Sequence, residues 1–224
     1  MMETWISSSR DRFTRSDFAF LAEILSPGDQ TRHLWTLWED PEAMREMLDL
    51  KQVFRGVIDS PGAVCVSPHF YFYVLVRHSF LDAGIGDVAV ADFVSAVLAE
   101  RVGADPNDVL KGVPSGLTHA ADFVSILESA RGRLRFHLQV AAGNQFLVLT
   151  GLFPGFLQRR CERRGAPGIE FYENFARQAY REAADNPLAP RHVPRQLFGE
   201  LSEVLPQARL TLNRVAEELV FLGD

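Results

Sequence analysis

Two rows of polar side chains, each on a strongly apolar segment, have residue types and a spacing that could support chemistry. His69, Tyr73 and Arg77 follow one another at four-residue steps, which places them along one side of a helix. His137 and Asn144, seven residues apart, share a face of the second segment. A buried donor or acceptor without a partner costs about 1–3 kcal/mol. The rows therefore predict either an internal hydrogen-bond network or an enclosed pocket for a small ligand or substrate.

Of these residues, Arg77 has the greatest need of a partner if it is buried. Its guanidinium keeps its proton under all ordinary conditions, and a buried charge needs a partner of opposite sign. If the segment is central in the fold, Arg77 should therefore meet a carboxylate or the site of an anionic ligand.

Histidines that lie one helical turn from a carboxylate raise the question of a metal site. The pairs are Asp29 with His33, His78 with Asp82, and His119 with Asp122. The spacing His78-x-x-x-Asp82 resembles the histidine and aspartate pairing in one helix of the haem-oxygenase-like di-iron oxidases, which would imply a helical enzyme that holds two iron ions. The Glu-x-x-His helix that completes such sites does not occur in the sequence. We therefore expect no metal and no cofactor, with each histidine hydrogen-bonded to its carboxylate.

Sequence motifs for nucleophilic catalysis and phosphate binding are missing. The chain contains no G-x-S-x-G, no G-x-x-x-x-G-K-[ST] and no G-x-G-x-x-G, which argues against hydrolase and phosphate-loop functions. Lys51 and Lys111 are the only lysines available for lysine chemistry. Cys161 lies among arginines that favour its thiolate, but catalysis would also need a base brought close by the fold. No residue is predicted to be catalytic, and whether the protein is an enzyme stays open.

Positive charge is concentrated in residues 131–164, which hold seven arginines and one acidic residue, Glu162. This local charge of +6 leaves −12 on the rest of the chain, because the overall charge is −6. Four of the arginines form i,i+4 pairs on a predicted short helix: Arg159, Arg160, Arg163 and Arg164. Like charges at this spacing repel by roughly a few tenths of a kcal/mol, so something acidic should offset them.

Two sources of negative charge could offset these arginines. The first is internal, with Glu170, Glu173 or the Glu217-Glu218 pair forming salt bridges. The second is an external anion, which could be a phosphate, a nucleic acid or an acidic protein. Since the sequence pI is about 5.5, the protein is not a general nucleic-acid binder, and any such contact must be local.

Composition places the chain among globular proteins. With 224 residues, of which 47% are hydrophobic and 23% charged, it can bury a full hydrophobic core. The first thirty residues lack the apolar core of a secretory signal, and two cysteines form no disulfide framework, so we expect a cytoplasmic protein.

Residues 138–157 are the most apolar stretch, but polar residues and Pro154-Gly155 interrupt it, which favours a buried helix over a membrane span.

The spacing of apolar residues predicts an all-α domain of about eight to ten helices, packed around two highly apolar helices. These two central helices are expected at residues 69–83 and 134–153. In the first, residues 70–76 form an unbroken apolar run, for which a buried strand is the competing prediction. In the second, Gly143 and Gly151 leave room for another helix to approach closely.

Capping residues mark where helices should begin and end. Asp40-Pro41 and Ser67-Pro68 combine an N-cap with a proline at the first helical position. Asp87 can cap a further helix, and Gly84 is a stop signal. The start at Ser67 and the stop at Gly84 favour a helix over a strand for the apolar run between them.

Two longer segments bear on organisation and assembly. Residues 103–118 are rich in Gly, Pro, Asn and Ser, so the single domain predicted for residues 1–224 either crosses its surface there or has a subdomain hinge. Leu201, Leu205, Ala208, Leu212, Val215, Leu219 and Leu222 alternate three and four apart in a coiled-coil-like seam. This seam predicts either core packing or a homodimer, and Pro206 should divide or kink its helix.

These features favour a non-catalytic cytoplasmic binding protein. We expect it to engage an acidic protein or other anionic partner through residues 131–164 and to self-associate through the C-terminal seam. The alternative is an enzyme or small-ligand-binding protein whose pocket is lined by the two polar rows.

Overall fold

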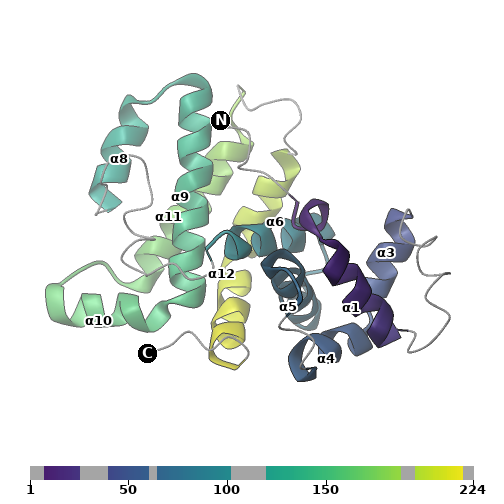
Figure 1. Ribbon diagram of the computed structural model, residues 1–224. Helices are drawn as coiled ribbons and strands as arrows, with labels where there is room; N and C mark the ends of the chain where they lie inside the picture. The colour runs from purple at the N-terminus through teal and green to yellow at the C-terminus, as the bar shows by residue number, and fades with distance from the viewer. Residues whose placement is uncertain (1–7, 26–39, 61–64, 102–119, 188–194, 219–224) are drawn as a thin grey trace. The chain divides into compact units, whose positions relative to one another are not determined.

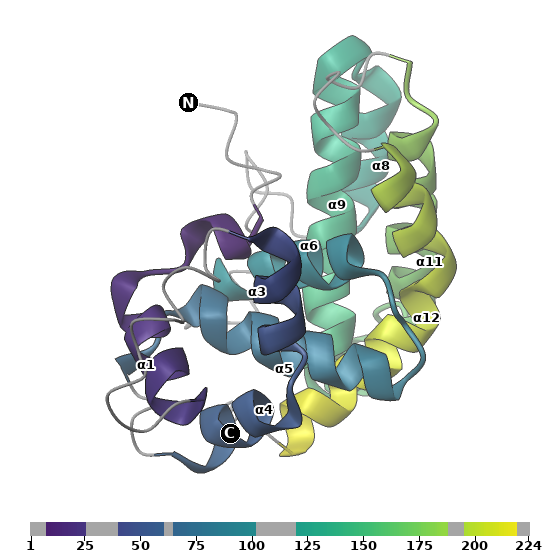
Figure 2. The same cartoon turned by 90° about the vertical axis from the view of Figure 1, so that its right-hand side faces the viewer.

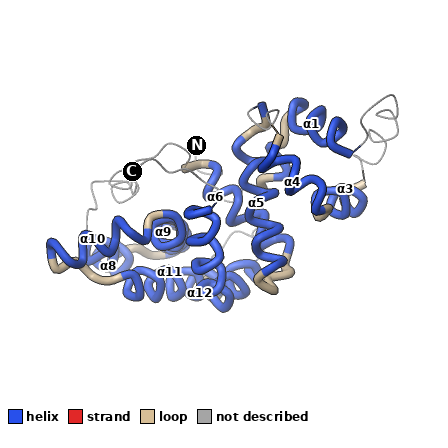
Figure 3. The backbone as a smooth tube through the Cα atoms, turned by 90° about the horizontal axis from the view of Figure 1, so that it is seen from below, coloured by secondary structure: helices blue, strands red, loops and turns tan. Residues whose placement is uncertain are grey.

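Figure 1 shows the computed structural model of the chain, which describes residues 8–25, 40–60, 65–101, 120–187 and 195–218. Within these ranges 83% of the residues are helical and none lies in a β-strand, as Figure 3 shows. The prediction of an all-α fold is therefore confirmed.

The chain divides into two compact units, Met1–Val102 and Gly103–Asp224. In the first unit the described elements are η2 (a 3₁₀ helix, Arg10–Arg12), α1 (Arg15–Leu25), α3 (Pro41–Leu48), α4 (Lys51–Asp59), α5 (Pro68–Asp82) and α6 (Val88–Ala99). In the second they are α8 (Ala120–Ser129), α9 (Gly132–Leu152), α10 (Pro154–Arg164), α11 (Ile169–Ala184) and α12 (Arg195–Glu218). The hinge predicted at residues 103–118 lies outside the described residues, and both it and the single domain stay predictions.

The apolar run at residues 70–76 belongs to α5, the most buried helix of the first unit apart from α6. The Ser67 Oγ accepts a hydrogen bond from the Phe70 backbone N–H at 3.2 Å, and Pro68 occupies the first helical position. The helix ends at Asp82, just before Gly84 with its φ of 80°, a conformation that favours glycine. The helical prediction is confirmed, because the cap and the glycine stop act as the sequence indicated. Helices α4 and α6 and the short η2 pack against α5.

The start of α5 is joined to α1 through one buried carboxylate. Asp17, which is fully buried, accepts hydrogen bonds from the Ser67 backbone N–H at 2.5 Å and the Ser67 Oγ at 2.7 Å. It also accepts from the Thr14 backbone N–H at 2.7 Å and the Thr14 Oγ1 at 2.9 Å. Four donors to one buried carboxylate fix the position of α1 relative to the capped end of α5.

In the second unit, α11 and α12 pack along the long apolar helix α9 (Figure 2). The two glycines of α9 permit this packing. A Cβ atom at Gly143 would lie 2.5 Å from the Tyr180 ring of α11, and one at Gly151 would lie 3.0 Å from Leu212 of α12. The predicted close approach of other helices at both glycines is therefore confirmed.

Helix α12 passes through Pro206 as one helix. Proline has no N–H, so the Ser202 carbonyl four residues earlier loses its helical donor. The Arg177 Nε of α11 donates a hydrogen bond to this carbonyl at 3.1 Å instead. Of the two outcomes predicted for Pro206, division into two helices is wrong, since α12 continues through it, and a kink stays a prediction.

The C-terminal seam is part of the core of the second unit. Its described members are all buried: Leu201, Leu205, Ala208, Leu212 and Val215. They lie on α12, which packs against α9 and α11, so core packing accounts for their spacing and they offer no surface to a second copy. Leu219 and Leu222 lie outside the described residues. Homo-oligomerisation as such stays a prediction.

Within the described residues, no single helix is long and apolar enough to cross a membrane. Helices α9 and α10 together have the length and apolar composition of a membrane span, but they meet at a bend of 92°. The residues of α9 from Phe136 to Leu152 are almost all buried in the structure.

Replacing Gly143 by alanine should destabilise the protein, although alanine is the better helix former. The added methyl group would meet the buried Tyr180 ring, and overpacking of this kind costs about 1–3 kcal/mol. Gly199 of α12 is the matched control, since a Cβ there meets nothing within 4 Å. Gly199→Ala should stabilise by up to about 1 kcal/mol. Urea denaturation measures both changes, and equal effects of the two substitutions would show that Gly143 has no steric role.

Asp17→Asn should destabilise the first unit. The amide presents donors of its own where Asp17 accepts four hydrogen bonds, and unpaired buried groups cost about 1–3 kcal/mol. Asp59 is the control, because it is exposed at the end of α4; Asp59→Asn should change the free energy of unfolding by less than about 0.5 kcal/mol. Thermal unfolding followed by circular dichroism distinguishes the two, and a neutral Asp17→Asn would contradict the anchoring role.

Candidate anion-binding surface on α10

The four arginines of the predicted short helix lie on α10. Pro154 at its first position begins the helix, and Gly165, with a φ of 61°, ends it. Leu157 is almost fully buried and anchors α10 in the second unit, where it packs against α9 and α11. At roughly 100° per residue, fixing Leu157 inward turns Arg159 and Arg163 outward.

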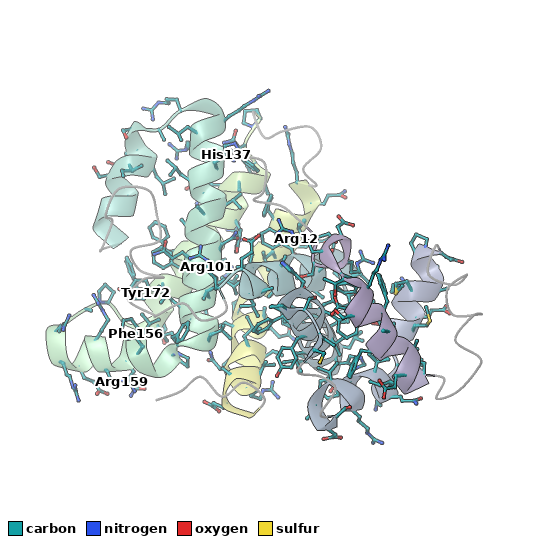
Figure 4. All side chains as sticks on the ribbon, viewed as in Figure 1. Arg12, Arg101, His137, Phe156, Arg159 and Tyr172 are labelled. Carbon is teal, nitrogen blue, oxygen red and sulfur yellow. The ribbon has the colours of Figure 1, made fainter. Side chains whose placement is uncertain are left out.

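The four side chains differ in exposure. Arg159, Arg163 and Arg164 are exposed, whereas Arg160 is half-buried. Figure 4 shows Arg159 on α10 together with Phe156 of the same helix and Tyr172 of α11. The structure therefore brings the four predicted arginines together on one surface, which we call the α10 arginine surface (Arg159, Arg160, Arg163 and Arg164).

In the described part of the second unit, no carboxylate lies within ion-pair distance of these arginines. The ion pairs that form there join Arg135 to Glu182 at 3.2 Å and Arg209 to Glu173. The acid nearest in sequence, Glu162, instead accepts a hydrogen bond from the Gln158 Nε2 at 3.1 Å. The positive charge of the α10 arginine surface is thus not offset by the described residues.

The internal acids that the sequence suggested as partners are placed differently. Glu173 is taken by Arg209 of α12. Glu170 and Glu217 are exposed, and neither forms an ion pair with α10 among the described residues. The side chain of Glu218 is not described. The predicted salt bridges with Glu173 are therefore wrong, because Arg209, a half-buried arginine on α12, pairs with that carboxylate.

Two of the three other arginines of residues 131–164, Arg131 and Arg135, serve a different purpose. Arg131 donates to the backbone carbonyls of Ala130, at 2.9 Å, and Glu128. Arg135 donates to the Leu127 carbonyl at 3.2 Å and to Glu182. Both stabilise the junction of α8 and α9, at the far end of a 21-residue helix from α10, about 30 Å away. The arginine-rich segment is therefore two separate groups.

Within the α10 arginine surface, Arg160 has a distinct environment. Its guanidinium carbon lies 5.6 Å from the centre of the Phe156 ring, one turn earlier on the helix, a cation–π arrangement. Its Nε is buried and has no hydrogen-bond partner among the residues that the structure describes. Burial raises the pKa of Tyr172, and the positive charge of Arg160 opposes this rise, so the charge is felt at the Tyr172 hydroxyl.

The first polar row lies on α5, and Arg77 meets a carboxylate as the sequence required. The Arg77 Nε donates to the Asp49 Oδ1 at 2.8 Å and the Nη2 to the Asp49 Oδ2 at 2.7 Å. The Nη1 donates to the Gly86 carbonyl at 2.8 Å. Hydrogen bonding to Asp49 raises the pKa of Arg77. The buried charge is satisfied within the first unit.

The other two members of this row have weaker partners. The His69 Nδ1 lies 3.3 Å from the Ser9 Oγ, and burial lowers the pKa of His69. Tyr73 is fully buried, and its hydroxyl has no hydrogen-bond partner within the described ranges. Burial raises the pKa of Tyr73 to about 12. The Arg10 guanidinium carbon lies 5.9 Å from the centre of the Tyr73 ring.

The second polar row lies on α9. The Asn144 Oδ1 accepts a hydrogen bond from the Tyr180 hydroxyl of α11 at 2.8 Å. His137 is half-buried (Figure 4), and burial lowers its pKa. Asn144 therefore belongs to a hydrogen bond between α9 and α11. The pocket that would join both rows stays a prediction.

His78 is held by a backbone carbonyl rather than by the neighbouring carboxylate. Its Nε2 donates to the Leu48 carbonyl at 2.9 Å, and its ring stacks on Phe54 at a centroid distance of 4.9 Å. The predicted hydrogen bond with Asp82 is therefore wrong, since Asp82 is exposed at the end of α5. His33 and His119 lie outside the described residues.

Among the described residues, no group of three or more His, Cys, Asp or Glu side chains could hold a metal ion. The expectation of no metal and no cofactor stays a prediction.

Sequence reasoning missed two residues that matter here. Phe156 stands four before Arg160, and this i,i+4 spacing on a helix is the signal that could have paired them. Asp49 carries no such signal, because it is 28 residues from Arg77 in sequence.

Comparison of the chain with protein families, with curated protein sequences and with solved structures found no match. The function must therefore be argued from the residues themselves.

The stability of the protein should decrease as the pH falls below 6.5, in part because of His78. Burial lowers the pKa of His78 from its ordinary value of 6.5, so the unfolded state binds this proton more readily than the folded state. The stabilising contribution is present above pH 6.5 and is lost as the pH falls through the lower folded-state value. In His78→Gln, the decrease of Tm between about pH 7 and about pH 5 should be smaller than in the wild type. An NMR titration midpoint of His78 at or above 6.5 would contradict this.

Proposed function

We propose that the protein is a non-catalytic binding protein that holds an acidic protein partner on the α10 arginine surface. The observation that supports this most directly is that, among the described residues, the four arginines have no carboxylate within ion-pair distance. Other arginines with buried contacts have found partners, as Arg77 has Asp49 and Arg209 has Glu173. Four positive charges on one short helix repel one another, and an acidic partner removes this repulsion.

An acidic protein fits the surface better than a nucleic acid does. The chain carries a net charge of −6, which opposes the approach of an extended polyanion but not a local contact with a small acidic segment. Arginine next to an aromatic ring, as Arg160 is next to Phe156, is typical of protein–protein interfaces. We propose the cytoplasm as the compartment, since Cys65 and Cys161 are both free and reduced thiols persist there.

Replacing Arg159, Arg160, Arg163 and Arg164 by glutamine should abolish binding to an acidic peptide. Glutamine removes the charge but keeps helix propensity and much of the side-chain stem. The probe is a fluorescent peptide of about twelve glutamates, with binding measured by anisotropy at two salt concentrations because charge-driven binding weakens with salt. The melting temperature should change by less than about 2 °C, since exposed charges contribute little to stability.

A matched variant distinguishes the effect of the α10 arginine surface on binding from the effect of the protein's net charge. Arg15, Arg55, Arg181 and Arg214 are exposed and lie outside α10, and changing all four to glutamine removes the same charge. This control should keep at least half of the wild-type affinity for the peptide. Equal loss in both variants would mean that net charge alone attracts the peptide. A melting temperature that drops several degrees only in the α10 variant would assign the arginines to internal pairing. Either result contradicts the proposed function, as would tighter binding of duplex DNA or of phosphatidylserine vesicles than of the peptide.

A further inference from the structure

The two arginines of this protein that are most deeply paired share one mode of contact. Arg77 presents its Nε and Nη2 to the two oxygens of Asp49, at 2.8 and 2.7 Å. Arg209 directs its Nε to the Glu173 carboxylate, with both side chains largely buried. In each unit, therefore, a guanidinium withdrawn from water donates its Nε–H to a carboxylate. The Arg77 pair is bidentate, which is the stronger form of this contact, whereas the Arg209 Nη1 donates to Asn213.

Arg160 has the same withdrawn Nε edge but no carboxylate. Among the described residues its buried Nε has no hydrogen-bond partner, although the residue as a whole is only half-buried. The Nε of Arg10 is also buried without a hydrogen bond in the described part of the chain, but it forms an ion pair with the Asp92 Oδ2 at 3.6 Å. For Arg160, no described carboxylate lies within ion-pair distance, so the site is an arginine–carboxylate pair with one member missing.

Its surroundings hold the Arg160 guanidinium in a defined place. It lies over the Phe156 ring at 5.6 Å, and its charge acts on the Tyr172 hydroxyl of α11. A planar guanidinium braced on an aromatic ring loses less freedom on binding than the exposed side chains of Arg159 and Arg163. Because the Nε is buried, binding requires the guanidinium to turn within its own plane while it stays over the Phe156 ring. Side-chain changes of this size are common when interfaces form.

We propose that Arg160 is the specificity-determining residue of the α10 arginine surface and binds one carboxylate of the acidic partner through its Nε edge. This inference rests on the proposed function. Arg159, Arg163 and Arg164 supply long-range attraction, which any positive charge could provide. Arg160 supplies a close, directional contact. Its carboxylate comes from the partner, whereas those of Arg77 and Arg209 come from the protein itself.

Lysine substitutions test this division, because they keep the charge and remove only the planar pair of donors. Arg160→Lys should weaken binding of the twelve-glutamate peptide about tenfold, the loss expected when a charged hydrogen-bonded pair is replaced by a point charge. Arg164→Lys, the matched control on the same helix, should weaken it less than about twofold. The tenfold difference should persist at about 0.5 M salt, because screening acts less on close contacts than on distant charges.

An NMR measurement on the wild type supports or refutes the contact without any mutation. The Arg160 Nε–H resonance, assigned from its loss in Arg160→Lys, should shift on addition of the peptide, whereas the Arg77 Nε–H resonance, already paired with Asp49, should not move. An Arg160 resonance that stays in place while the peptide binds would overturn the inference.

The outcomes distinguish this inference from the proposed function. If Arg160→Lys and Arg164→Lys weaken binding equally while the fourfold glutamine variant abolishes it, the surface binds acidic partners but Arg160 has no special role. If the fourfold variant binds the peptide as its control does, the proposed function itself fails, and the inference fails with it.

Discussion

Two helices that are buried over most of their surface determine how each unit of this protein is built. α5 in the first unit and α9 in the second bury mostly hydrophobic side chains, and such a helix is stable only when other elements cover it. In the first unit α4, α6 and η2 pack against α5, and in the second unit α8, α10, α11 and α12 pack against α9. The two glycines of α9 follow from the same constraint, because Tyr180 and Leu212 occupy the space that side chains would fill.

Covering these helices removes their polar side chains from water, and partners on other elements replace the lost solvent. Arg77 of α5 is neutralised by Asp49, which directly follows α3. Gln139 of α9 donates to Glu182 of α11 at 2.8 Å. Burial raises the pKa of Glu182, but hydrogen bonds from Gln178, Gln139 and Arg135 outweigh this effect and lower it. The same contacts that satisfy the polar groups also fix how the covering helices are aligned.

Helix α10 departs from this pattern. Leu157 joins it to the core, but its arginines remain outside the internal pairing that serves Arg135 and Arg209 in the same unit. The i,i+4 repulsion among these arginines is small, roughly a few tenths of a kcal/mol for each pair, but among the described residues no carboxylate offsets it. The acidic partner that we propose would bring carboxylates of its own, and in that proposal one of them binds at the buried Nε of Arg160.

The sequence by itself determined the all-α fold and the ends of the helices that begin with a cap. A capping residue acts on residues within one turn of itself, so its effect can be predicted from the neighbouring sequence. This holds for Ser67 with Pro68, Asp40 with Pro41, and Asp87. The i,i+4 pairs on α10 and the need of Arg77 for a carboxylate were predictable for the same reason.

Only the tertiary structure decided which groups meet. Asp49 reaches Arg77 across 28 residues, Asp17 reaches Ser67 across 50, and Arg177 supplies the donor that lets α12 continue through Pro206. The seam of α12 has the spacing of a dimer interface, yet α9 and α11 cover it within one chain. Spacing specifies that a face must be buried, because apolar surface avoids water, but what buries it depends on chain elements far away in sequence.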